Sequence, residues 1–126
     1  MTEFEITLQL VDSPVDQSQS GGSMPADKLV DAFHAFPFAD EIKRAEGMDG
    51  ATFPTITFIR KSDREEIAIW TDDAVSYDMH LKSGSFSRFV NSQTPAQVEG
   101  MLVRFTSESV AEIAPKKKGL WGRLFG

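Results

Sequence analysis

The chain has 126 residues, a formal net charge of −6 and no cysteine. This length predicts one domain with one hydrophobic core, and the lack of cysteine excludes disulfides, thiolate nucleophiles and cysteine-ligated zinc. No apolar run approaches the roughly 20 residues that span a bilayer, and the start MTEFEITLQL lacks the basic region of a signal peptide. We therefore expect a soluble protein of the cytoplasm.

Charge is distributed unevenly along the chain. Residues 116–126 contain four of the 13 Lys and Arg residues and none of the 19 Asp and Glu residues. Nine basic residues thus face 19 acidic ones in residues 1–115, so this part carries −10 and the tail carries +4. An acidic part of this kind argues against nucleic-acid binding, which needs Lys and Arg for phosphate contacts. It suits a basic protein partner, because opposite potentials steer association, or it serves solubility alone.

The N-terminal segment predicts a strand followed by a loop. Phe4, Ile6, Leu8 and Leu10 alternate with polar residues, which is the period of a half-buried strand. Residues 12–25, DSPVDQSQSGGSMP, are rich in Ser, Gly, Gln and Pro and have almost nothing to bury. This composition predicts a mobile loop. It is not a phosphate-binding loop, because no Lys follows at P-loop spacing.

The next stretch predicts two helices. Apolar residues fall at helical spacing over residues 25–35, and Pro37 ends this helix near Ala35. A second short helix is expected over 38–46. The stretch FHAFPF, residues 33–38, places three Phe around the proline. We interpret it as core packing at the corner between the helices, with a peptide-binding groove as the alternative.

From residue 52 the pattern changes to that of strands. Segments 52–61, 66–71, 75–82 and 85–90 are rich in β-branched and aromatic residues and are joined by short turns, which predicts an antiparallel meander. Ile59 and Trp70 fall on the face opposite the main apolar face. The second face of the sheet is therefore expected to be partly apolar, and either covered by a helix or available to a partner.

The last helix is marked by Thr94-Pro95-Ala96-Gln97, a capping box with Pro at the first helical position. A break is expected near residue 107, with a restart at Ser107 or Ser109. Together these elements predict an α+β fold. It contains an antiparallel sheet of about five strands, the N-terminal strand plus the four-strand meander, with two or three helices packed on one face. Residues 1–115 form one domain, and residues 116–126 form a tail.

Few residues suggest catalysis. Asp78 and His80 share one strand face at i, i+2, a spacing at which a carboxylate can orient an imidazole for general-base work. Exposed pairs of this kind are common on protein surfaces, and we expect no catalytic residue here. No metal-ligand spacing such as H-E-x-x-H occurs, so no metal and no cofactor are expected.

The tail is basic and amphipathic. On a helix, its large apolar side chains fall on one side and its basic ones around the other. Its Leu124-Phe125 end resembles the end of the short peptides that bacterial sliding clamps bind, although Trp121 stands where those peptides carry Gln. Three uses remain open: covering the domain's own Ile59/Trp70 side, weak contact with an anionic membrane, or docking into a protein groove. The candidate tail residues are Lys116, Lys117, Lys118, Leu120, Trp121, Arg123, Leu124 and Phe125.

These observations favour a non-enzymatic protein-binding module. Its acidic body would engage a basic or polar protein, in the manner of a toxin-neutralising immunity protein or a secretion chaperone. Ile59, Trp70, Asp78 and His80 are the candidate contacts on the second face of the sheet. One alternative is a peripheral adaptor held at the inner membrane surface by residues 116–126. A second alternative is a small enzyme that uses His80 and Asp78.

Overall fold

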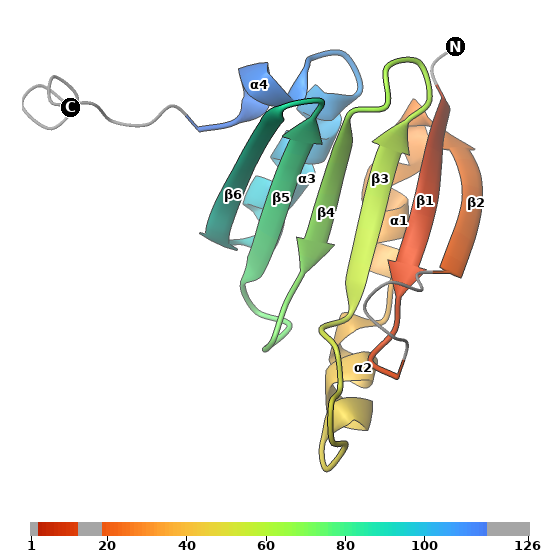
Figure 1. Ribbon diagram of the computed structural model, residues 1–126, viewed down its shortest axis with the longest axis vertical. Helices are drawn as coiled ribbons and strands as arrows, with labels where there is room; N and C mark the ends of the chain where they lie inside the picture. The colour runs from red at the N-terminus through yellow and green to blue at the C-terminus, as the bar shows by residue number, and fades with distance from the viewer. Residues whose placement is uncertain (1–2, 13–18, 116–126) are drawn as a thin grey trace, which may run out of the picture.

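A six-stranded antiparallel sheet forms the centre of the computed structural model, which describes residues 3–12 and 19–115 (Figure 1). The strand order is β2-β1-β3-β4-β5-β6. The α+β class and the meander of the last four strands are confirmed, with one strand more than the five expected. The strands are β1 Glu3–Gln9, β2 Gln19–Pro25, β3 Thr55–Arg60, β4 Glu66–Trp70, β5 Tyr77–Ser83 and β6 Phe86–Gln93.

The additional strand is β2 Gln19–Pro25, and for these residues the expectation of a loop is wrong. Residues 19–25 pair antiparallel with β1, with Met24 opposite Phe4 and Gly22 opposite Ile6. A Cβ atom added at Gly21 would lie 3.1 Å from Cγ2 of Ile6, which is closer than an ordinary carbon–carbon contact. Glycine, which has no Cβ, therefore suits this position. An edge strand of this kind is held by main-chain hydrogen bonds to one neighbour, which explains why its sequence shows no hydrophobic alternation. Residues 13–18 of the expected loop lie outside the described residues.

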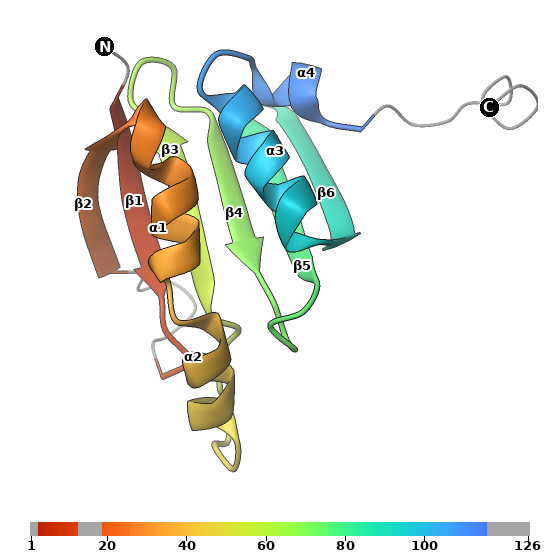
Figure 2. The same ribbon diagram turned by 180° about the vertical axis from the view of Figure 1, so that it is seen from behind.

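The helices pack on one face of the sheet, as expected. Figure 2 shows α1 and α3 across this face, with α2 beyond one end of the sheet and α4 near the other. The capping box at Thr94 is present, and Ser109 is the N-cap of the restarted helix. The helical segments are η1 Ala26–Lys28, α1 Leu29–Ala35, α2 Phe38–Ala45, α3 Pro95–Phe105 and α4 Val110–Ile113.

The three Phe residues of the FHAFPF stretch belong to the core. Phe33, Phe36 and Phe38 are all at most 7% exposed. The Phe38 ring meets Phe36 edge-on at 4.6 Å and Tyr77 at 5.1 Å between centroids. This geometry supports the interpretation as a packed corner between α1 and α2, and it fixes α2 against the start of β5.

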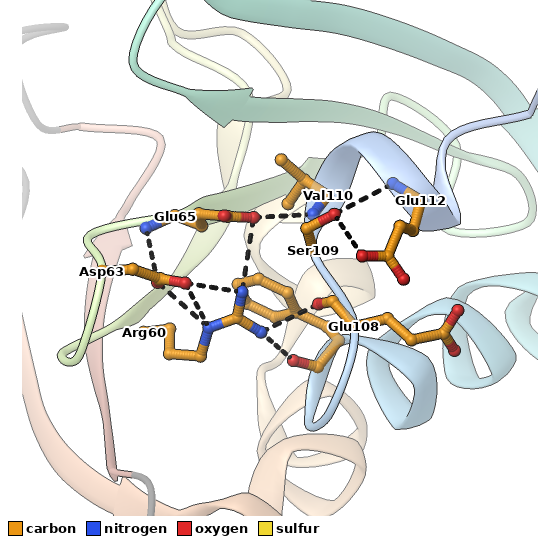
Figure 3. Close-up of polar contacts among 8 residues, drawn as sticks. Arg60, Asp63, Glu65, Glu108, Ser109, Val110 and Glu112 are labelled. Atoms are coloured by element: carbon orange, nitrogen blue, oxygen red, sulfur yellow. Dashed lines mark hydrogen bonds and ion pairs between the residues drawn. The ribbon is translucent and has the colours of Figure 1, made fainter.

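A buried arginine joins the sheet to the C-terminal helices (Figure 3). Arg60 is 7% exposed, and its guanidinium lies over the Phe105 ring, 4.7 Å from the centroid. It donates to the carboxylate of Asp63 and to the carbonyl oxygens of Phe105 and Glu108, the latter at 2.9 Å. Glu65 lies 3.3 Å from the same guanidinium and accepts the N–H of Val110. The β3–β4 turn is thereby tied to the segment between α3 and α4.

We expect stability to fall in mild acid. Hydrogen bonds from Arg44 lower the pKa of Glu41, those from Arg60 lower the pKa of Asp63, and backbone N–H groups lower the pKa of Asp73. A carboxyl group with a lower pKa in the folded state stabilises the fold at pH values above its unfolded pKa. That stabilisation is lost as the pH falls through the folded pKa values, below the ordinary 3.8 of Asp and 4.5 of Glu.

Urea unfolding measured between pH 7 and pH 3 tests this expectation. The midpoint should be nearly constant down to about pH 5 and should then drop. The Asp73→Asn variant removes one of the responsible groups, so its midpoint should drop less steeply. A midpoint that rises on acidification would contradict the lowered pKa values of these carboxyl groups.

Candidate functional site

The face of the sheet opposite the helices carries no covering layer among the described residues (Figure 1). We call it the open face. Strand register arranges its outward side chains in three rows across the sheet, since successive residues of a strand point to opposite faces. The rows are Gln9–Thr55–Trp70–Asp78, Thr7–Thr57–Ala68–His80–Phe89 and Glu5–Ile59–Glu66–Lys82–Ser87.

Three aromatic rings meet on the open face, and we call Trp70, His80 and Phe89 the aromatic cluster. His80 and Phe89 face each other across β5 and β6, with their rings stacked at 4.2 Å and 8°. The Trp70 ring meets Phe89 edge-on at 6.1 Å. Phe89 is nevertheless 60% exposed, whereas Trp70 and His80 are half-buried. A large exposed ring in an ordered cluster is an arrangement that protein interfaces use.

The imidazole of His80 is held in a defined position. Its Nε2 lies 2.6 Å from the hydroxyl oxygen of Ser87. Burial lowers the pKa of His80, the charge of Lys82 lowers it further, and Glu66 opposes both. The ring is therefore neutral at pH 7, which leaves the aromatic cluster without a charge and suits it to apolar contacts.

The Phe89→Ser variant is expected to raise the pKa of His80 toward its ordinary value of 6.5. The stacked ring shields one side of the imidazole from water, and water stabilises the protonated form. Titration of the His80 ring protons by NMR measures this change. Lys82→Gln serves as a comparison and should raise the pKa by less, because burial is the larger cause. An unchanged value in Phe89→Ser would show that the stacking does not desolvate His80.

Asp78 does not orient His80 in the way that catalysis would need. Its carboxylate accepts the backbone N–H of Ser92 at 3.0 Å, next to the irregularity in the β5–β6 pairing. Ser92 has a positive φ of 58°, so this hydrogen bond supports an uncommon backbone conformation. Asp78 thus has a structural role in the β6 strand, while His80 contacts Ser87 and Phe89.

A groove adjoins the aromatic cluster. It has a volume of about 530 Å³ and shares Trp70 with the cluster. Phe53, which is 56% exposed, forms another of its apolar walls. Every residue that lines the groove is uncharged, although a quarter of the chain is charged. The groove therefore suits apolar and neutral polar groups: its lining residues are Thr7, Gln9, Ala51, Thr52, Phe53, Thr55, Thr57 and Trp70.

The structure brings together only part of the predicted site. Trp70 and His80 meet in the aromatic cluster. Ile59 lies on the same face, but it is 9% exposed between Glu5 and Glu66 and offers little surface. All the predicted tail residues lie outside the described residues. Phe89, the most exposed member of the cluster, was missed, because only the pairing of β5 with β6 places it opposite His80.

Neither the described residues nor comparison with known proteins supplies further candidates. Within residues 3–12 and 19–115, no group of three or more His, Asp or Glu residues could hold a metal ion. No helix in these ranges has the length and apolar character to cross a membrane. Comparisons with protein-family models, curated proteins and solved structures gave no match. The candidate site therefore rests on the geometry of the open face.

Proposed function

We propose that this chain is a non-enzymatic protein-binding module that receives its partner on the open face. The observation that carries this proposal is the aromatic cluster, with Phe89 60% exposed on a face that no described helix covers. Aromatic side chains supply much of the binding energy at protein interfaces. The adjoining uncharged groove extends the surface that a partner could bury.

The charge of residues 1–115 supports a basic or polar partner. This part of the chain carries −10. On the open face, Glu5 and Glu66 lie in one row together with Lys82, and Asp78 lies in another row. Opposite potentials speed association, whereas the desolvated apolar centre sets the lifetime of the complex. A toxin-neutralising immunity protein and a secretion chaperone both act in this way, by binding alone.

The two alternatives have less support. An enzyme built on His80 and Asp78 would need their side chains to interact, yet Asp78 accepts the N–H of Ser92 and His80 contacts Ser87. A membrane adaptor depends on residues 116–126, which lie outside the described residues. Neither alternative uses Phe89, the most exposed ring of the cluster.

Affinity capture from extracts of the source cells tests the proposal. The baits are the full chain, the Phe89→Ser variant and the Val103→Ser variant. Val103 is a matched control, because it is 59% exposed and lies on α3, on the other side of the sheet. We expect a partner that Phe89→Ser loses and Val103→Ser retains, and that binds the purified wild-type chain directly. If Val103→Ser loses the bound proteins and Phe89→Ser retains them, the binding surface lies on the helical side.

A further inference from the structure

We propose that the tail of this chain, residues 116–126, occupies the open face when no partner is bound. Leu120, Trp121, Leu124 and Phe125 would lie against the aromatic cluster and the adjoining groove. This inference shares its surface with the proposed function, and its consequence for partner affinity rests on that function. The docking itself needs no partner and is tested without one.

The described chain ends at the β6 edge of the sheet. Ile113 and Ala114 are buried, at 3% and 7% exposure, so the main chain is fixed up to this point. Arg88 of β6 then donates a hydrogen bond from its guanidinium to the carbonyl oxygen of Pro115. Phe89 is the next residue of β6. Arg88 and Phe89 point to opposite faces of β6, because successive residues of a strand alternate. The tail therefore starts at the β6 edge of the sheet and would pass around this edge to reach the Phe89 ring.

The length of the tail matches the width of this face. The groove lies between β1, β3 and β4, so a chain that enters at β6 must cross four strand spacings, about 19 Å at about 4.8 Å each. An extended chain covers roughly 3.3–3.6 Å per residue. Lys116 to Gly119 would span about 13 Å, which brings Leu120 and Trp121 over the cluster. Leu124 and Phe125 would then reach the groove.

The chemistry of the two parts is complementary. The tail offers four large apolar side chains, and the open face offers a neutral aromatic cluster beside an uncharged groove. The tail carries +4 and residues 1–115 carry −10, so their overall charges attract. Attachment at Pro115 also places the tail at an effective concentration of about millimolar, which lowers the affinity that docking requires. A separate protein or a membrane would lack this advantage.

Docking of the tail would cover the open face with residues of the same chain. A partner that binds there would have to displace the tail, so its apparent affinity would be reduced by the fraction of molecules in which the face is covered. Substitutions that release the tail should then increase partner affinity several-fold. If these substitutions leave partner affinity unchanged, only the proposed competition between the tail and the partner is wrong. The binding function is tested separately, by capture with the Phe89→Ser and Val103→Ser baits.

A spin label in the tail tests docking directly. The chain has no cysteine, so Gly122→Cys provides a single attachment site in the full-length protein. NMR of the ¹⁵N-labelled protein should show strong broadening of the amides of Ala68, Trp70 and Phe89. Amides of α1 on the helical side should be much less affected. In the control, Trp121, Leu124 and Phe125 are all replaced by Ser in the same labelled chain, and the broadening of the open face should be lost.

Three results would overturn the proposal. Broadening that is the same with and without the three Ser substitutions would show that the apolar side chains do not dock. Broadening of a ¹⁵N-labelled copy by a spin label on an unlabelled copy would assign the tail to a second molecule. If the open face is unaffected and the full chain, but not the triple Ser variant, sediments with anionic vesicles, the tail binds membranes instead.

Discussion

Replacing Arg60 with Met is expected to lower the free energy of unfolding by about 3 kcal/mol. The substitution removes the donors for the Phe105 and Glu108 carbonyl oxygens and leaves Glu65 without its cation. Breaking a buried ion pair costs about 3–5 kcal/mol, and the lower end applies because the Asp63 side chain is 43% exposed to water. Urea unfolding at pH 7 measures the change.

Arg64→Met is the matched control in the same turn. Arg64 pairs with Glu5 at 3.2 Å, but its side chain is 64% exposed. An exposed pair of this kind contributes about 0–1 kcal/mol, so this variant should unfold close to the wild type. Equal losses in the two variants would mean that burial of the Arg60 guanidinium does not determine its contribution.

Phe38→Ala should also lower stability strongly, by about 3–5 kcal/mol. Phe38 is 4% exposed and packs against Phe33, Phe36 and Tyr77, so its removal leaves a cavity at the corner between α1 and α2. The matched change is Phe89→Ala on the open face, expected to alter stability by only about 0.5 kcal/mol because the ring is 60% exposed.

This comparison bears on function as well as on stability. Thermal and urea unfolding of both variants measure the two losses under the same conditions. A small loss for Phe89→Ala would mean that the fold does not need this ring, which agrees with a role in binding. A loss as large as that of Phe38→Ala would instead make Phe89 a structural residue and remove the main support for the open face as a binding surface.

Much of the fold could be predicted because its patterns are local. The alternation in β1, the capping box at Thr94 and the proline at 37 each act within a few residues of the chain. The strand β2 could not be predicted in this way. Its pairing with β1 depends on main-chain hydrogen bonds and on Gly21 fitting over Ile6, and neither leaves a hydrophobic period in the sequence.

Less of the candidate site than of the fold could be predicted from the sequence. Trp70 was placed on the second face from its alternation with Ile67 and Ile69, and the structure confirms this placement. Phe89 and Ser87 become neighbours of His80 only through the register of β5 and β6. Arg60 was not identified either, because its partners Glu65, Phe105 and Glu108 are brought together by the tertiary fold.

The most direct measurement of the central claim is the dissociation constant of the captured partner for three purified full-length chains. We predict that Phe89→Ser weakens binding at least tenfold, about 1.4 kcal/mol, and that Val103→Ser binds like the wild type. Both variants should keep the wild-type free energy of unfolding within about 0.5 kcal/mol, so that any change in affinity reflects the surface. If Phe89→Ser binds as tightly as the wild type, the open face is not where this protein meets its partner.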